Sequence, residues 1–537
     1  MRTLFIISDL HLGGRPHDVH RDGSLLPGYQ FNHSYPALIE FIDWAGAQAG
    51  DGNAADIELV INGDIVDFLA EDDEDGSFQA WTADEALACA KLDRIAGRTR
   101  GSGRCGLFEA LGAFLHAGHR LTLLLGNHDV ELSLPAVRQR LVTLLGGDAA
   151  GLTFIYDGEA YRAGRVLIEH GNRYDRWNRV DYNGLREERS MRSRGLALDE
   201  SLRGKRYFMP PAGSHMVVDV INRLKARYRF IDLLKPETGA VIPLLLALEP
   251  SSARYLRGAI DAYLTLPERF GDGMLSPTEP GNPDFMGKDP EPFDRVLNEA
   301  LDASDARLFR ACWSGPATAP AASDHGDDLS IRSTAAAVAA QVRAGVEQVR
   351  AWQLAAADGI AALAHRNIDA IADVRWRQLH AALRRVLQRD GSFDVEREDA
   401  NYLDAARQIV GGGKIDVVVN GHTHLPKRIR LAPTERPCWY LNTGTWCDVL
   451  RLPDELGQEF AQARPALDRF LAALRDNDLQ HHVSRYLSYV EIRLGADLAP
   501  LGAPCLHSYC GRGHERGDPL TPYPAPRRAG LPDTERM

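Results

Sequence analysis

Short apolar runs rich in branched residues recur along the first third of the chain, and each run ends at a cluster of polar residues. The runs cover residues 4–7, 57–61, 121–125 and, with a weaker pattern, 166–168. Near-continuous apolar character is typical of strands buried on both faces, and helical patterns between such strands indicate βαβ crossovers. We therefore expect parallel strands here, with crossover helices over residues 35–49 and 107–117.

This alternation stops after about residue 175, and the pattern as far as about residue 411 is helical or irregular. A long segment rich in Ala, Arg, Gln and Leu covers residues 335–387, and strand patterns return at 415–419, 439–441 and 489–492. A structureless loop of that length would be implausible. The division that we expect is a core domain made of residues 1–175 and 411–495, a helical insertion or lid subdomain at 176–410 with a flexible linker near 316–328, and a poorly ordered Pro-, Gly- and Arg-rich tail at 496–537.

The composition of the chain indicates a globular protein and disfavours some partners. The apolar fraction of 44% and the charged fraction of 25% are those of an ordinary globular protein. A net charge of −12 disfavours nucleic acid as a partner, although local basic patches stay open. The seven cysteines are odd in number and form no CxxC pairs, which predicts reduced thiols and a cytoplasmic location.

No transmembrane segment is expected. The run before Asp9 is too short for a signal peptide. The most apolar later stretch, residues 241–248, contains Pro243 and is far shorter than the roughly 20 residues that a membrane span needs. Peripheral membrane contact stays open.

Five polar clusters carry the candidate chemistry, and each follows a predicted strand. They are Asp9-Leu10-His11, Gly63-Asp64-Ile65-Val66-Asp67, Gly126-Asn127-His128-Asp129, His170-Gly171-Asn172 and Gly421-His422-Thr423-His424. Because the carboxyl ends of parallel strands meet at one edge of a sheet, these side chains should converge. Extended turns would let residues two apart, such as Asp9 and His11, point the same way, and the glycines would allow backbone to approach a metal closely.

The ligand types predict a dinuclear metal site. Carboxylate, amide oxygen and imidazole without thiolate favour manganese, iron or zinc over magnesium alone, and disfavour structural zinc. A carboxylate such as Asp64 can bridge two ions about 3.5–4 Å apart, which would clamp a phosphate. Each cluster alone is an ordinary turn; it is their ordered series that makes the metal site the better interpretation.

The series resembles the motifs of the calcineurin-like metallophosphoesterase superfamily: D-x-H, G-D-x-x-D, G-N-H-[DE], a mid-chain His and a final G-H-x-H. The resemblance covers residues 1–175 and 411–495. It implies an α/β fold, a four-layer sandwich of two mixed β-sheets flanked by helices, here carrying a large mainly helical insertion.

The resemblance also implies roles for individual residues. The first metal would be held by Asp9, His11, Asp64 and His424, and the second by Asp64, Asn127, His170 and His422. His128 would bind neither metal, but would steady the phosphoryl group and protonate the leaving oxygen. Asp67 would orient His128 through a hydrogen bond.

The implied activity is hydrolysis of a phosphomonoester, phosphodiester or pyrophosphate bond by metal-activated hydroxide, with an anionic phosphoester as substrate. The two divalent ions would be manganese, with iron or zinc as alternatives. Residues 8–13 and 442–446 resemble the bacterial branch that contains UDP-2,3-diacylglucosamine pyrophosphatase. The chain departs from that branch in having His128 where Arg is common, in its greater length and in its insertion, so the substrate stays open.

Several further interpretations stay open. Asn172, Arg173 and Arg176 follow His170 and could bind a second phosphate or carboxylate, or could form a solvated, salt-bridged helix start. The apolar residues 230–234 and 241–248 could cover a lipid, although packing of a helical core is favoured. A nuclease would need a basic groove with stacking aromatic residues, and the acidic balance weakens that alternative. A non-catalytic scaffold would not need eight intact site residues.

Overall fold

The computed structural model describes residues 1–14, 18–19, 25–26, 30–49, 56–73, 76–100, 105–147, 150–175, 177–225, 228–235, 237–248, 368–431 and 436–523. These residues divide into two compact units. The first unit takes its residues from the ranges 1–211, 391–449 and 484–537, and the second from 212–390 and 450–483.

This division differs from the expected boundaries of the insertion. Residues 176–211 and 391–410 group with the core, while residues 450–483 group with the helical unit. The expected linker at 316–328 lies outside the described residues, as does the expected helical segment up to residue 367. Helix α15 (Ile368–Arg389) covers the end of that segment.

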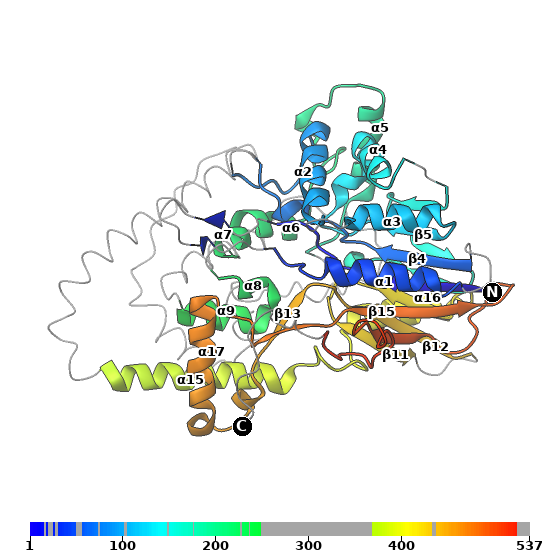
Figure 1. Ribbon diagram of the computed structural model, residues 1–537. Coiled ribbons are helices and arrows are strands. Elements are labelled where there is room, and N and C mark those ends of the chain that lie inside the picture. The colour runs from blue at the N-terminus through cyan, green and yellow to red at the C-terminus, as the bar shows by residue number, and fades with distance from the viewer. Residues whose placement is uncertain are drawn as a thin grey trace, which may run out of the picture. The chain divides into compact units, whose positions relative to one another are not determined.

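A six-stranded mixed sheet forms one half of the first unit (Figure 1). Its order is β16 (Cys505–Ser508), β15 (Ser488–Leu494), β1 (Arg2–Ile7), β4 (Ile57–Asn62), β5 (Arg120–Leu124) and β6 (Leu152–Ile155). Strands β1, β4, β5 and β6 are parallel, whereas β15 runs antiparallel to β1 and to β16. The strands expected at 4–7, 57–61, 121–125 and 489–492 are therefore confirmed.

A five-stranded mixed sheet forms the other half. Its order is β11 (Pro426–Leu431), β12 (Cys438–Thr443), β10 (Val417–Asn420), β8 (Val166–Ile168) and β7 (Tyr161–Ala163). Strands β8, β10 and β12 are parallel, and the two outer strands are antiparallel to their neighbours. The strands expected at 166–168, 415–419 and 439–441 are confirmed, the second beginning two residues later than expected.

Alternation along the strands packs the two sheets face to face. In β1, Leu4 and Ile6 point into a core shared with Val417, Val419 and other residues of the five-stranded sheet. Phe5 and Ile7 point the opposite way and pack under α1 (Tyr35–Ala47), α2 (Glu85–Arg98), α3 (Leu107–His116) and α4 (Pro135–Leu144). Helix α16 (Ala400–Gly411) packs on the outer face of the other sheet. Helices, sheet, sheet and helix follow one another, an order compatible with the expected sandwich.

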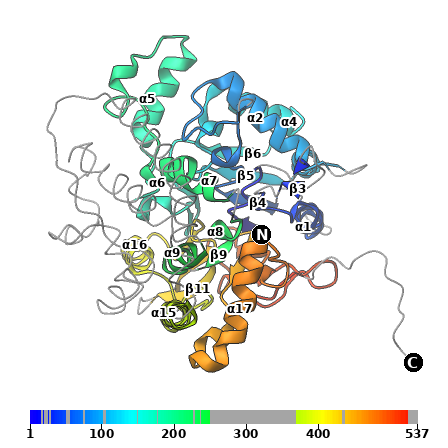
Figure 2. The same ribbon diagram turned by 90° about the vertical axis from the view of Figure 1, so that its left-hand side faces the viewer.

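Helices α1 and α3 confirm the expected crossovers over residues 35–49 and 107–117. Helix α1 buries Ala37, Leu38, Phe41, Ile42 and Ala45, which is the spacing of one helix face. Helix α2 begins after Asp84, whose carboxylate accepts hydrogen bonds from the amides of residues 86 and 87. Figure 2 shows α2 beside α4.

The second unit is mainly helical. Its longer helices are α9 (Glu237–Leu248), α15 and α17 (Phe460–Asp476), with shorter α6 (Ala212–Met216), α7 (Asn222–Lys225) and α8 (Phe230–Leu233). Strand β9 (Leu234–Lys235) pairs with β13 (Asp448–Arg451). The residues of 230–234 and 241–248 whose exposure is described are mostly buried, which confirms core packing. No described helix combines the length and apolar character of a membrane span.

The expectation of a poorly ordered tail at 496–537 is wrong for residues 505–508. These residues form β16, which pairs antiparallel with β15. Leu506 and Tyr509 are buried. Local composition rich in Pro and Gly did not reveal the strand, because a neighbouring strand supplies the hydrogen bonds that stabilise it.

Candidate metal centre

Every expected metal ligand lies in a loop of the first unit that directly follows a strand. Asp9 and His11 follow β1, Asp64 follows β4, Asn127 follows β5, His170 follows β8, and His422 and His424 follow β10. Within each of three groups, the first two of which share His11, the possible ligand atoms lie within 4.8 Å of one another: Asp9, His11 and His424; His11, Asp67 and His128; and Asp64, His170 and His422. The two sheets thus bring together side chains that are more than 400 residues apart in the chain.

Hydrogen bonds between the loops hold this arrangement. The backbone amide of Asp9 donates to the carbonyl of Gly63 at 3.1 Å, and that of His11 donates to the carbonyl of Asp64 at 2.9 Å. The carboxylate of Asp9 accepts from the backbone amide of His422 at 2.9 Å. The loops after β1 and β4 therefore run side by side, and Asp9 ties them to the loop after β10.

At five of the seven expected ligands the backbone is left-handed rather than extended. The φ angles are 53° at Asp9, 39° at His11, 50° at Asp64, 70° at His422 and 63° at His424. In the described part of the chain only three other non-glycine residues have positive φ. The expected extended turns are thus wrong, although the expected convergence is right. Non-glycine residues in this region cost roughly 1–3 kcal/mol each, and such strain clusters at functional sites.

Two glycines leave room for ligand side chains. A Cβ at Gly126 would lie 1.9 Å from Oδ1 of Asp64, and one at Gly63 would lie 2.5 Å from Nδ1 of His170. Gly63 also has a φ of 82°. The backbone at these positions thus lies close to two expected ligand side chains, and its expected approach to a metal stays a prediction.

Two imidazole rings are held by one nitrogen and present the other. Nδ1 of His170 lies 2.8 Å from the backbone carbonyl of Asn62, so this nitrogen must donate. Nδ1 of His11 likewise faces a carboxylate oxygen of Asp67 at 3.2 Å. In each neutral ring Nε2 then carries a lone pair.

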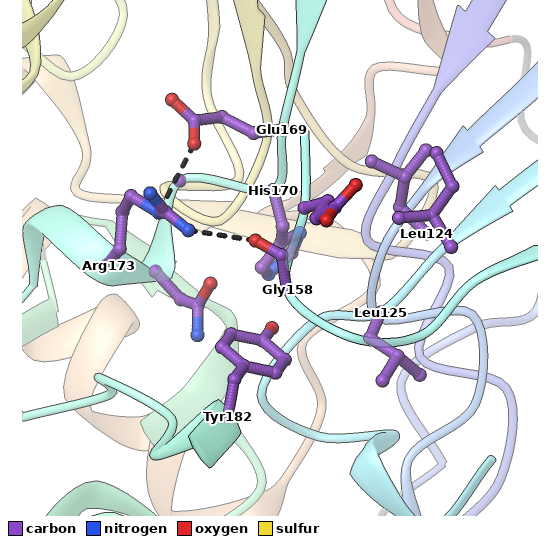
Figure 3. A pocket seen from close by; sticks show the side chains of 11 residues that line it. Leu124, Leu125, Gly158, Glu169, His170, Arg173 and Tyr182 are labelled. Atoms are coloured by element: carbon purple, nitrogen blue, oxygen red, sulfur yellow. Dashed lines mark hydrogen bonds and ion pairs between the residues drawn. The ribbon is translucent and has the colours of Figure 1, made fainter. Parts of the chain in front are cut away.

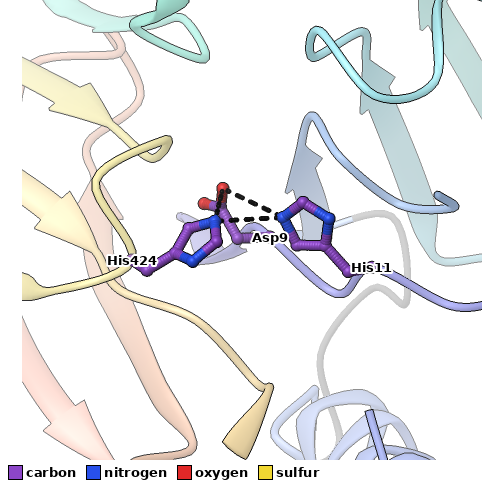
Figure 4. A group of neighbouring side chains, drawn as sticks. All are labelled: Asp9, His11 and His424. Atoms are coloured by element: carbon purple, nitrogen blue, oxygen red, sulfur yellow. Dashed lines mark hydrogen bonds and ion pairs between the residues drawn. The ribbon is translucent and has the colours of Figure 1, made fainter. Parts of the chain in front are cut away.

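These lone pairs face other electron-rich atoms. Nε2 of His170 lies 3.1 Å from Oδ2 of Asp64, and Nε2 of His11 lies 3.0 Å from Nε2 of His424 (Figure 4). Oδ1 of Asn127 is buried and has no hydrogen-bond partner among the described residues. A divalent cation would satisfy all of these atoms at once, so the residues present fit a metal site.

The electrostatics of the site favour a cation. Burial acts to raise the pKa of Asp9, but the charges of His170 and His424 lower it to about 2. The pKa of Asp64 is lowered well below its ordinary value, because His170 and His128 outweigh the effect of burial. Burial acts to lower the pKa of His170, while the carboxylates of Asp64 and Asp9 raise it to about 10. The buried carboxylates are thus ionised and attract positive charge.

Asp67 contacts two histidines. Its Oδ1 lies 3.1 Å from Nδ1 of His128 and accepts from the amide of Ala70 at 3.0 Å, while its Oδ2 faces His11. Burial acts to raise the pKa of Asp67, but His128 and His11 lower it below the usual range. The side chain of His128 is 17% exposed, against 5% for His11. Asp67 therefore orients a ring that a molecule in solution can reach.

The expected substrate contacts have partners within the protein. Arg173 donates to the carbonyl of Gly158 at 2.9 Å and forms an ion pair with Glu169 at 3.3 Å. It lines a pocket beside His170, together with Leu124, Leu125 and Tyr182 (Figure 3). Asn172 is buried and donates to the carbonyl of Asn178 at 2.9 Å. Arg176 lies outside the described residues, and substrate binding by these residues stays a prediction.

The sequence interpretation assigned no role to three residues that lie around the site. Asp129 accepts from the amides of Gly126 and Ile65 at 2.7 and 2.8 Å, and burial followed by repulsion from Asp64 raises its pKa to about 8. Asp175 lies 3.1 Å from His422, and Asn178 contacts Asn127. Asp129 is the last residue of the G-N-H-[DE] motif, whereas the only sequence signal of Asp175 and Asn178 was that they follow His170 along the chain.

The motif at 442–446 supports the last ligand loop. Asn442 donates to the carbonyl of Gly421 at 2.6 Å and to the hydroxyl of Thr423 at 3.0 Å. The hydroxyl of Thr443 lies 2.5 Å from that of Ser8, which also hydrogen-bonds Asp9. This motif therefore holds the loop that bears the expected ligands His422 and His424, and through Ser8 it contacts the side chain of Asp9.

Neither a family model nor a curated protein sequence matches this chain. The evidence for the chemistry of the site is therefore its geometry.

Proposed function

We propose that this protein is a dinuclear-metal-dependent phosphoesterase of the calcineurin-like kind. The observation that carries the proposal is the orientation of the His11 and His170 rings. Each is anchored through Nδ1 and turns Nε2, the nitrogen that carries the lone pair when the ring is neutral, toward carboxylates or another imidazole. The two mixed sheets with ligand loops at the carboxyl ends of their parallel strands support the same fold family.

The proximity of Asp64 to both halves of the site supports two metal positions. Its Oδ2 lies 3.1 Å from Nε2 of His170 and 3.6 Å from Nε2 of His11. In this proposal Asp64 is shared; the first metal also takes Asp9, His11 and His424, and the second also takes Asn127, His170 and His422. When bound, two ions of manganese, iron or zinc would polarise the phosphoester and lower the pKa of a water molecule.

His128 is the proposed catalytic residue. The carboxylate of Asp67 accepts from Nδ1 of His128, and the proposal assigns Nε2 to the substrate. In its doubly protonated form the ring would donate from Nε2 to a phosphoryl oxygen and pass that proton to the leaving oxygen, which leaves a neutral ring with its remaining proton on Nδ1. Asp67 would act as a positioning residue, because it fixes the tautomer and also anchors His11.

A substrate panel tests the activity and its class. Metal-free protein would be supplied with Mn²⁺ and assayed on p-nitrophenyl phosphate, its bis-ester, UDP-sugars, nucleotide pyrophosphates and labelled single-stranded DNA. We expect metal-dependent hydrolysis of at least one phosphoester and its loss in the Asp64→Asn variant. Absence of hydrolysis on every substrate with fully loaded protein would contradict the proposal, and cleavage of DNA alone would favour the nuclease alternative.

A further inference from the structure

Asp175 contacts an expected ligand of the second metal. Its Oδ2 lies 3.1 Å from Nε2 of His422 and accepts from the side-chain amide of Asn178 at 2.6 Å. Its Oδ1 accepts from the backbone amide of Trp177 at 2.9 Å. A carboxylate only accepts hydrogen bonds, so each of these three neighbours must donate to it.

The first consequence concerns His422. Because Nε2 donates to Asp175, the lone pair of the neutral ring lies on Nδ1. This is the reverse of His11 and His170, where Nδ1 is anchored and Nε2 faces the site. His422 would therefore coordinate through a different nitrogen from those two histidines.

The second consequence is the orientation of the side-chain amide of Asn127, which contacts Asn178. Since the amide nitrogen of Asn178 faces Asp175, its Oδ1 faces the other way and accepts from Nδ2 of Asn127 at 3.4 Å. The nitrogen of Asn127 is thereby engaged. Its Oδ1, buried and without a hydrogen-bond partner among the described residues, is the atom presented to the site.

We propose that Asp175, directly and through Asn178, selects the ligand atoms of the second metal, Nδ1 of His422 and Oδ1 of Asn127. This inference rests on the proposed dinuclear site. Asp175 would be a positioning residue, as are the carboxylates that anchor metal-bound histidines in general. The first metal would depend on it less, because His11 is anchored by Asp67 and His424 faces Asp9 at 3.3 Å.

Metal binding by three variants tests the proposal. Mn²⁺ titrations by calorimetry would compare the wild type with Asp175→Ala, Asn178→Ala and the control Asp157→Asn. Asp157 is exposed, and its neighbour Gly158 accepts a hydrogen bond from Arg173. Loss of an anchor on a metal ligand typically weakens affinity about 10–100-fold. We expect that loss at one of two sites in Asp175→Ala, a smaller loss at the same site in Asn178→Ala, and no change in the control.

Histidine tautomers give a second readout, which a merely structural role would not move. In ¹⁵N-histidine spectra of the Zn²⁺-loaded protein, we expect the ring of His422 to be protonated on Nε2. The rings of His11 and His170 should be protonated on Nδ1 instead. The Nε2–H signal should change in Asp175→Ala and persist in Asn178→Ala, since only the first variant removes the acceptor. The more conservative Asp175→Asn serves in place of the alanine variant if the latter does not fold.

Two results would overturn the inference while leaving the proposed function standing: two metals bound by Asp175→Ala with wild-type affinities, or equal weakening of both. A wild-type tautomer pattern in that variant would do the same. A wild-type protein that binds no Mn²⁺ would instead contradict the proposed function, and the inference with it.

Discussion

The Nε2 atoms of His11 and His424 lie 3.0 Å apart, and the His424 nitrogen lies 3.3 Å from an oxygen of Asp9 (Figure 4). The other nitrogen of His11 donates to Asp67, so its Nε2 carries a lone pair when the ring is neutral. In the metal-free protein a proton on Nε2 of His424 would bridge these atoms, and a bound cation would take the place of that proton. Because the three side chains converge only in the folded state, a bound metal should make the folded protein more stable.

Metal removal should lower thermal stability. A ligand that binds only the folded state stabilises it by about 2.7 kcal/mol at a hundred times its dissociation constant. We expect the melting temperature to fall after dialysis against a chelator and to recover when Mn²⁺ is added, as measured by differential scanning calorimetry. An unchanged melting temperature would show that the site does not bind metal under those conditions.

The Gly126→Ala variant should lose metal. The added Cβ would fall 1.9 Å from Oδ1 of Asp64, so the shared carboxylate must move. Metal content measured by mass spectrometry should drop well below the wild-type value. Gly97→Ala in α2 is the matched control, because its Cβ would meet no atom within 4 Å. Helix propensity predicts that the control is neutral or slightly stabilising, and equal metal loss in both variants would refute the steric explanation.

Substitutions of His128 and Asp64 should have different effects on catalysis and on metal binding. The His128→Ala variant should lose about 10²–10⁴-fold in turnover, the usual contribution of a general acid. Its metal content should stay near that of the wild type. The Asp64→Ala variant should lose both metals together with activity. Similar metal loss in the two variants would contradict the proposed division of roles.

The stability of the fold should also depend on pH through Glu131, which lies outside the ligand set. This side chain is fully buried; Oε1 accepts from the amide of Thr82 at 2.9 Å, and Oε2 has no hydrogen-bond partner among the described residues. Burial raises the pKa of Glu131 to about 7 from a usual value of 4.5. The folded state then binds this proton more tightly than the unfolded state, so stability falls as the pH rises between these values.

The Glu131→Gln variant isolates that effect. Relative to the wild type, its free energy of unfolding should increase between pH 4.5 and 7, by on the order of 3 kcal/mol. Urea denaturation in the presence of a chelator would measure the difference without contributions from bound metal. A difference that is independent of pH would show that Glu131 titrates normally in the folded protein.

The sequence predicted where each ligand-bearing strand ends, because strands buried on both faces leave a continuous apolar signal that stops at the polar cluster. It did not predict the left-handed backbone at Asp9, His11 and Asp64, since those angles depend on contacts between loops. Nor did it identify Asp175 as the neighbour of His422, 247 residues away along the chain. That pairing arises only because β8 and β10, which are distant in the sequence, are neighbouring strands of the five-stranded sheet.

The division of the chain into two units was also not predicted correctly from the sequence. Residues 450–483 lie between strands of the core along the chain, yet they group with the helical unit through α17. Even where an amphipathic pattern is present, as in α17, it does not reveal which surface the apolar face covers. Strand β16 was missed for a similar reason, because its partner β15 determines it.

The most direct test of the proposed dinuclear phosphoesterase activity is the number of Mn²⁺ ions bound per chain. This number would be measured together with hydrolysis of bis(p-nitrophenyl) phosphate on the same samples as metal is added. The account predicts two ions per chain, hydrolysis that increases as the second ion binds, and an exchange-coupled manganese spectrum. A protein that binds a single ion, or that hydrolyses the ester equally well without metal, would contradict it.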